Sequence, residues 1–182
     1  RDQEYTVRAS SRTGFAAYTA ADLKTALGDL PKDQKIAAKS VLKKLDPVTK
    51  QQLEALIAWN RVQYKDATGH TLIDNLWALG DKKLLHGIQN QDLVREIIRD
   101  VARPSTIAQA QHPTCSATSV QSALARQAPG EYARLLAGLA SGDGVVTCRD
   151  GKMKLSSAIY LPYKDRTVTG NLFQPAGMDA QA

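Results

Sequence analysis

Apolar side chains recur at intervals of three and four through the first hundred residues, the spacing that places them on one face of an α-helix. The firmest stripe consists of Leu93, Val94, Ile97, Ile98 and Val101, and Arg103-Pro104 follows it as a stop signal. Weaker stripes predict further helices over residues 19–28, 31–45, 46–64 and 72–80. The pattern therefore predicts a helical first half of the chain.

Several of these helices begin at residues that can bind the free amides of a first turn. Thr19 and Asp22 have the spacing of a capping box. Asp46-Pro47 combines an N-cap carboxylate with a proline at the first helical position, and Pro31 suits the first turn of the helix before it.

The stretch from Pro104 to Ala125 contains no Asp, Glu, Lys or Arg, and it is too rich in Gln, Ser, Thr and His to cross a membrane. We expect a connecting segment up to Pro113. Thr114-Cys115 then opens a helix whose inner face holds Ala117, Val120 and Leu124. A further helix begins at Pro129 and closes near Gly142.

The pattern changes to short strands after Gly142. A β-hairpin is predicted from strands 145–148 and 153–156 around the turn 149–152, with further strand candidates at 4–8, 158–161 and 167–169 and a loose tail over 174–182. The expected fold class is α+β: a mainly helical N-terminal half, the helix opened by the cysteine, then a small antiparallel β segment. We divide the chain into a helical lobe, 1–103, and a portion with the cysteine helix and hairpin, 104–182.

Composition narrows the function classes without naming one. The 182 residues are 43% hydrophobic and 23% charged, which is typical of a folded domain. The net charge of +6 is modest, and neither interleaved aromatic residues nor a glycine-rich phosphate loop accompanies it, so we expect no nucleic-acid partner. No apolar run approaches the ~20 residues of a membrane span, so we expect a soluble protein. The chain begins at Arg1 rather than Met, which suggests a trimmed or processed chain.

Positive charge concentrates on one predicted helix. Residues 32–50 hold six lysines against two aspartates, +4 of the total +6, and Lys32, Lys35, Lys39 and Lys43 form a single stripe. Lys35, Lys39 and Lys43 are therefore candidate binding residues for an acidic partner. The alternative is a solvated helix face with no partner.

Cys115 is the strongest candidate for chemistry. A thiol at the start of a helix meets free amides and the positive end of the peptide dipoles, which stabilise a thiolate and can receive an oxyanion. Gln109, six residues earlier, has a side-chain amide that could donate a second hydrogen bond to that oxyanion. The alternative for Cys115 is a small apolar residue packed in an alanine-rich helix.

The spacing of Gln109 and Cys115, followed by strands, resembles papain-like cysteine peptidases and their bacterial relatives, including transglutaminase-like and toxin-type enzymes. The resemblance covers about fifteen residues and the order of elements. It implies a cysteine hydrolase or acyl transferase of the kind found among secreted bacterial effectors, with a protein or peptide substrate and no cofactor. The residues Pro-Thr-Cys-Ser-Ala differ from the glycine-rich surroundings of the cysteine in papain itself.

The family places its catalytic histidine after the cysteine, whereas His70, His86 and His112 all precede Cys115. The resemblance then requires a histidine from a second chain or a C-terminal portion, or, as a weaker alternative, His112. Cys115 and Cys148 could also form a disulfide in an oxidising compartment. No His-x-x-His or Cys-x-x-Cys spacing indicates a metal site. A non-catalytic helical protein-binding module with a basic helix face remains the alternative function.

Overall fold

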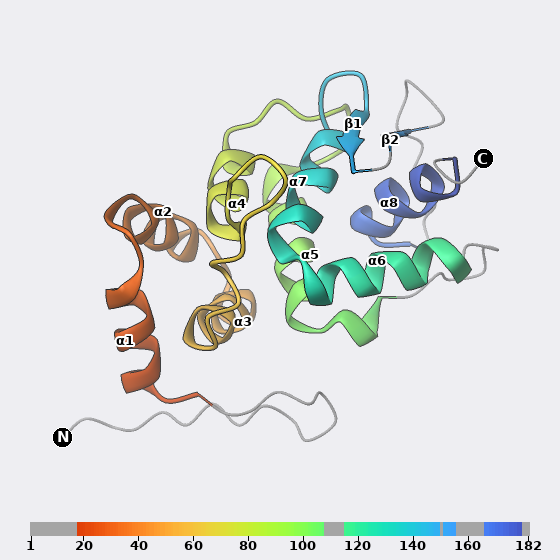
Figure 1. The fold of residues 1–182 in the computed structure, drawn as a ribbon. Helices are drawn as coiled ribbons and strands as arrows, with labels where there is room; N and C mark the ends of the chain where they lie inside the picture. Colours follow the sequence, from red (N-terminus) through yellow and green to blue (C-terminus); the bar gives the residue numbers. More distant parts are fainter. Residues whose placement is uncertain (1–17, 108–114, 150, 156–165, 180–182) are drawn as a thin grey trace.

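Helices dominate the computed structural model, which describes residues 18–107, 115–149, 151–155 and 166–179 (Figure 1). The described part contains eight α-helices, one 3₁₀ turn and one β-hairpin, so the α+β class is confirmed. The elements are α1 (Ala20–Asp29), α2 (Lys32–Lys43), α3 (Pro47–Ala58), α4 (Leu72–Gly80), α5 (Asn90–Ala102), η1 (Pro104–Thr106), α6 (Cys115–Gln127), α7 (Pro129–Leu139), β1 (Val145–Cys148), β2 (Gly151–Lys154) and α8 (Val168–Asp179).

Two of the predicted start signals form caps, whereas Pro31 stands just before α2 rather than in its first turn and makes no side-chain cap. Thr19 and Asp22 make a reciprocal capping box at α1, in which the Asp22 carboxylate accepts from the Thr19 amide at 2.8 Å. Asp46 accepts from two amides of the first turn of α3, directly before Pro47. A second capping box, Thr71 with Asp74, starts α4. Each cap binds amides that the helix itself leaves unpaired.

Helix α5 lies at the centre of the molecule. Its predicted stripe is buried, with Leu93, Ile97, Ile98 and Val101 fully enclosed. Helices α3 and α4 pack against it from one side and α6 and α8 from the other, while α7 crosses between them (Figure 1). One buried apolar cluster runs from Ala26 in α1 to Ala176 in α8. The division of the chain at residue 103 stays a prediction.

The β-hairpin is confirmed, with a shorter turn than expected. β1 and β2 pair antiparallel, with Val146 opposite Met153 and Cys148 opposite Gly151. Val146 and Met153 point to the same face and are buried against helices α7 and α8. The hairpin therefore covers one end of the helical core.

The predicted strand at 167–169 is wrong, and so is the loose tail as far as Asp179, because α8 occupies this region. Gly170, Asn171 and Pro175 all disfavour a helix interior, and they masked the pattern. Leu172, Phe173 and Ala176 nevertheless lie at i, i+1 and i+4 and are buried. Packing of this face outweighs local propensity. The strand candidates at 4–8 and 158–161 lie outside the described residues.

Two other helices differ from their predicted form. The inner face of α6 consists of Ala117, Gln121 and Ala125, whereas Val120 is 48% exposed. The sequence pattern misled here because a polar residue, Gln121, takes the innermost position. Helix α3 ends at Ala58 rather than Tyr64, because Asn60 takes a left-handed backbone conformation with φ of 57°.

The described helices include none that is long and apolar enough to span a membrane.

We expect the substitution Gly138→Ala to lower the free energy of unfolding by about 1–3 kcal/mol, because the added methyl overpacks the contact between α7 and β1. A Cβ at Gly138 would stand 2.6 Å from Cγ2 of Val146 and 2.7 Å from its Cβ. Urea unfolding of the variant and the wild type measures the loss.

The matched control is Gly28→Ala in α1, where a Cβ would meet nothing within 4 Å. That change should leave stability unaltered or raise it by up to about 1 kcal/mol through helix propensity. Equal stabilities of the two variants would show that α7 and β1 do not approach as closely as described.

Candidate active site at the start of helix α6

Cys115 is the first residue of α6, and its side chain is exposed to solvent. Its carbonyl oxygen accepts from the Ser119 hydroxyl at 2.9 Å, one turn along. The amides of the first turn have no acceptor within the helix and carry the positive end of its dipole. The position therefore combines a nucleophilic sulfur with hydrogen-bond donors for a negative charge.

The surroundings of Cys115 include one polar atom without a partner. Thr118 follows three residues later, on the same side of the helix. Its hydroxyl oxygen is buried, and no described residue makes a hydrogen bond to it. Cys148, the second cysteine, is half-buried on β1, and both thiols are free. The predicted alternative of a disulfide between them is therefore not formed.

Gln109 and His112, the other two predicted catalytic residues, lie outside the described residues. Their roles beside Cys115, as oxyanion donor and as general base, therefore stay predictions.

His70 lies near the C-terminal end of α6, whereas Cys115 is the first residue of that helix, so His70 is too far away to act on the thiol. It lies in the loop between α3 and α4, where its Nδ1 is 2.9 Å from the Thr68 hydroxyl. This loop packs on the start of α7, since a Cβ at Gly130 would stand 3.4 Å from the His70 carbonyl oxygen. The start of α7 adjoins the last residue of α6, which is about 18 Å along the helix axis from Cys115.

His86 is exposed in the segment between α4 and α5. Its neighbour Leu85 donates a backbone hydrogen bond to Ala140, just beyond the end of α7. His86 therefore lies near the C-terminal end of α7, the end away from the turn between α6 and α7. The backbone hydrogen bond of Leu85 holds its segment there.

A chain of buried hydrogen bonds holds α6 in place. Gln174 of α8 donates to Gln121 of α6 at 3.1 Å, and Gln121 donates to the Tyr132 hydroxyl of α7 at 2.9 Å. Tyr132 and Thr169 both donate to Oδ2 of Asp100 on α5, each at 2.7 Å. These five side chains, which we call the core polar chain, are at most 3% exposed. They tie four helices together through neutral donors.

Asp100 is the acidic member of the core polar chain. Burial raises the pKa of its carboxyl group above the ordinary value of 3.8, against the opposing effects of the Thr169 and Tyr132 hydroxyls and of Arg99. The Arg99 guanidinium is 3.8 Å from the other oxygen of Asp100, and the Arg99 side chain is 40% exposed. Burial likewise raises the pKa of Glu96, one turn earlier, although its carboxylate accepts from the Thr169 amide at 3.0 Å. The interior beside α8 therefore favours protonated carboxyl groups.

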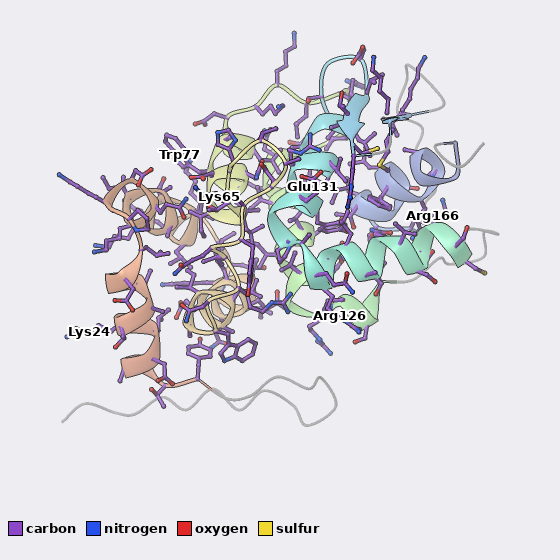
Figure 2. The ribbon with its side chains drawn as sticks, viewed as in Figure 1. Lys24, Lys65, Trp77, Arg126, Glu131 and Arg166 are labelled. Atoms are coloured by element: carbon purple, nitrogen blue, oxygen red, sulfur yellow. The ribbon has the colours of Figure 1, made fainter. Side chains whose placement is uncertain are left out.

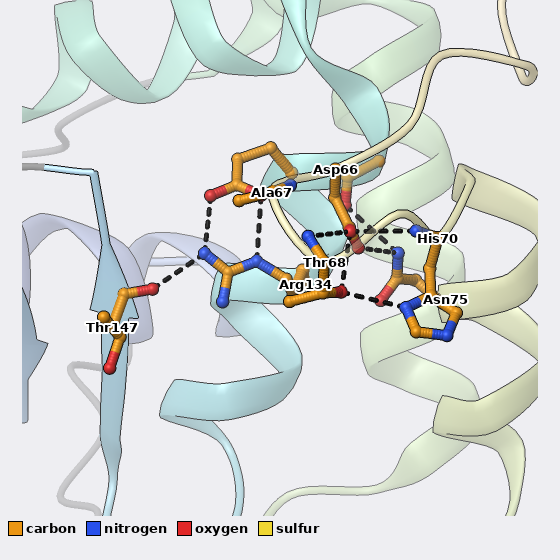
Figure 3. Close-up of polar contacts among 9 residues, drawn as sticks. Asp66, Ala67, Thr68, His70, Asn75, Arg134 and Thr147 are labelled. Carbon is orange, nitrogen blue, oxygen red and sulfur yellow. Dashed lines mark hydrogen bonds and ion pairs between the residues drawn. The ribbon is translucent and has the colours of Figure 1, made fainter.

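A second polar cluster fixes the loop that carries His70 (Figure 3). Asp66 accepts from the amides of Thr68 and His70 and from the side-chain amide of Asn75. Burial opposes its ionisation, but these donors outweigh burial and hold its pKa below the ordinary value. The cluster was missed in the sequence, although Asp-x-Thr before a glycine is the kind of turn in which a carboxylate binds nearby amides.

Arg134 on α7 joins this loop to the hairpin. Its guanidinium donates to Glu131 and to the Thr147 carbonyl oxygen of β1, the latter at 2.7 Å (Figure 3). Hydrogen bonds from Arg134 lower the pKa of Glu131, which also accepts from the Ala67 amide. This ion pair is 15–18% exposed at its side chains and is satisfied on both sides, so it holds structure and leaves no group free for chemistry.

The predicted lysine stripe lies on the outer face of α2. Lys39 and Lys43 are exposed and Lys35 is half-buried. Lys35 and Lys39 line a groove between α1 and α2, whereas Lys43 is not among its lining residues. Lys24 of α1 lines the same groove and was not singled out from the sequence.

Within the described ranges, no group of three or more His, Cys, Asp or Glu side chains could hold a metal ion. Comparison with protein families, with curated proteins and with solved structures finds no match to this chain. The site is therefore interpreted from its own residues.

We expect Asp100→Asn to gain stability relative to the wild type as pH rises. Burial raises the folded-state pKa of Asp100 above 3.8, so the unfolded chain releases this proton at a lower pH than the folded protein does. The free energy of unfolding of the wild type therefore falls as pH rises from the unfolded-state pKa through the folded-state pKa. Asparagine has no proton to lose, and its carbonyl oxygen can accept from the same hydroxyls. Urea unfolding from about pH 4 to 8 measures the difference. A difference that does not change with pH would contradict the raised pKa.

Tyr132→Phe serves as the companion variant, because it keeps the ring that lies 6.1 Å from the Phe173 ring. It leaves Asp100 with one hydroxyl donor and Gln121 without its acceptor. We expect a loss of about 1–3 kcal/mol in the free energy of unfolding. The loss should be larger at neutral pH than at pH 4, since the charged carboxylate depends most on its donors.

Proposed function

We propose that this chain carries the nucleophile of a papain-like cysteine hydrolase or acyl transferase, with Cys115 as the attacking residue and a peptide or other amide as substrate. The observation that carries the proposal is the exposed thiol at the first position of α6, a helix whose body is packed on α5, α7 and α8. A buried, inert cysteine would have had the opposite placement.

The proposed reaction uses the Cys115 thiolate, the first-turn amides of α6 and the Gln109 side chain. The Cys115 thiolate attacks the carbonyl carbon of the amide, and the carbonyl oxygen becomes an oxyanion that the first-turn amides of α6 and the Gln109 side chain receive. Collapse of this intermediate breaks the C–N bond, and the leaving amine takes a proton from a general acid. The resulting thioester passes to water in a hydrolase or to an amine in a transferase, and the thiolate is regenerated.

The fixed position of α6 supports this proposal, because catalysis needs the sulfur held within a few tenths of an ångström of its productive place. Both polar atoms of the Gln121 side-chain amide are paired: Nε2 donates to the Tyr132 hydroxyl, and Oε1 accepts from Gln174. These bonds determine the rotation of α6 about its axis. The rotation in turn decides which way the side chain of Cys115 points.

The general base is the remaining requirement. His70 lies by the start of α7, next to the end of α6 that is about 18 Å along the helix axis from Cys115. We therefore propose that the base is a histidine of a C-terminal portion or of a second chain, as the papain-like order implies, with His112 as the candidate within this chain.

The alternative is a non-catalytic helical protein-binding module, in which Cys115 has no chemical role. The observation that favours it is the groove between α1 and α2, whose rim includes two lysines of the predicted stripe. This groove is remote from Cys115 in the fold, so the two functions can be tested separately.

We expect Cys115 to react with iodoacetamide at pH 7 faster than a small free thiol, since helix-start amides favour the thiolate. The variant Cys148→Ala isolates its reaction, and mass spectrometry of the intact chain follows the rate. The same variant in the presence of a peptide vinyl sulfone should lose a single equivalent of thiol.

The matched control is Cys115→Ala, which leaves the half-buried Cys148 as the single thiol. Cys148 should alkylate more slowly than a free thiol, because β1 and the hairpin shield it. If Cys115 reacts no faster than the free thiol, or no faster than Cys148, the thiolate is not activated and the proposed enzyme function is wrong.

A further inference from the structure

A groove of about 490 Å³ lies between α1 and α2 at the edge of the molecule. Figure 1 shows the two helices meeting at an angle, away from the helices that surround α5. α1 packs mainly on α3, and α2 packs mainly on α4. Because each helix leans on a different neighbour, the angle between them stays open.

The floor of the groove is apolar. Leu23 and Leu27 of α1 line it and are half-buried, whereas Ala26 on the inner side of the same helix and the C-cap residue Leu30 are buried. Gly28 continues the lining, and a Cβ there would meet nothing within 4 Å. Leu23 and Leu27 therefore pack partly against the core and leave the rest of their apolar surface open to the groove.

The rim of the groove is positively charged. Lys24 projects from α1, away from the body of the molecule (Figure 2). Lys35 and Lys39 of α2 line the groove as well. The lining residues include no carboxylate. The nearby Asp22 is engaged by the Thr19 amide in its capping box. An apolar floor between lysines on both sides complements a segment with apolar side chains flanked by carboxylates.

We propose that the α1–α2 groove binds an acidic, amphipathic segment of a partner protein, whose leucine-like side chains enter between Leu23 and Leu27 while its carboxylates face Lys24, Lys35 and Lys39. This is the helix-in-groove mode of recognition. Ile36, next to Lys35 on α2, is 61% exposed and would be available to a partner that also contacts the outer face of this helix. The site does not involve Cys115 and goes beyond the proposed catalytic function.

The charge of the chain's own first seventeen residues argues against them as the occupant. They contain Arg1, Arg8 and Arg12 against Asp2 and Glu4, a net positive charge that does not complement a lysine rim. A partner with carboxylates fits the groove better by the sign of its charge alone.

Fluorescence anisotropy with a short fluorescein-labelled peptide tests the proposal. The peptide has leucines at i, i+3 and i+7 and glutamate or alanine elsewhere, and two companions replace either its leucines by serine or its glutamates by lysine. We expect the leucine–glutamate peptide alone to bind, with an affinity that falls as salt is added. The double variant Lys35→Glu and Lys39→Glu should weaken binding by roughly tenfold or more, because repulsion replaces attraction.

The matched control is Lys152→Glu with Lys154→Glu, the same change of charge on the exposed residues of β2. It should leave the affinity within about twofold of the wild type, because these lysines are remote from the groove. The proposal is overturned if no peptide binds, if the two double variants weaken binding equally, or if the serine peptide binds as well as the leucine peptide. A peptide of residues 1–17 that binds more tightly than the acidic probe would also overturn it. None of these outcomes depends on the reactivity of Cys115.

Discussion

The arrangement of the C-terminal helices depends on one set of buried hydrogen bonds, those of the core polar chain: Gln174, Gln121, Tyr132, Asp100 and Thr169. Apolar packing alone would leave α6 free to rotate or slide, because alanines make up much of its buried face. A buried amide or hydroxyl that loses its partner costs about 1–3 kcal/mol, so each such movement carries a definite penalty. The core polar chain therefore selects one orientation of α6 from several that would bury similar apolar area.

This selection has a cost, because the acceptor that two hydroxyls of the core polar chain share is the buried carboxyl group of Asp100. Asp100 receives two hydroxyl donors and only a distant guanidinium, an arrangement that satisfies a carboxyl group without fully neutralising it. The cluster around Asp66 shows the opposite solution, in which several amide donors stabilise the ionised form. The two clusters give the protein opposing dependences on pH: near α8 burial favours protonation, and in the α3–α4 loop hydrogen bonding favours the charge.

The sequence was sufficient where structure is set locally. The caps at Thr19 and Asp46, the stripe of α5 and the hairpin are each determined by residues a few positions apart. It was insufficient where distant contacts decide, as in α8, where Gly170 and Pro175 disguise a helix that Phe173 anchors in the core. The candidate site divides in the same way. The helix start at Cys115 follows from nearby residues, whereas the exposure of its thiol depends on tertiary packing. The groove likewise needs the packing of α1 on α3 and of α2 on α4.

The described helices between the groove and Cys115 share one continuous core. Allostery requires an element with two arrangements, and this packed core offers none between the two places. Their relation is better described by tethering. A partner segment seated between α1 and α2 would keep the rest of the partner near the molecule and raise its effective concentration at Cys115 without changing the geometry there. If Cys115 is the nucleophile that we propose, binding energy gained at the groove would lower the substrate concentration needed for half-saturation and leave the chemical step to the residues around the sulfur.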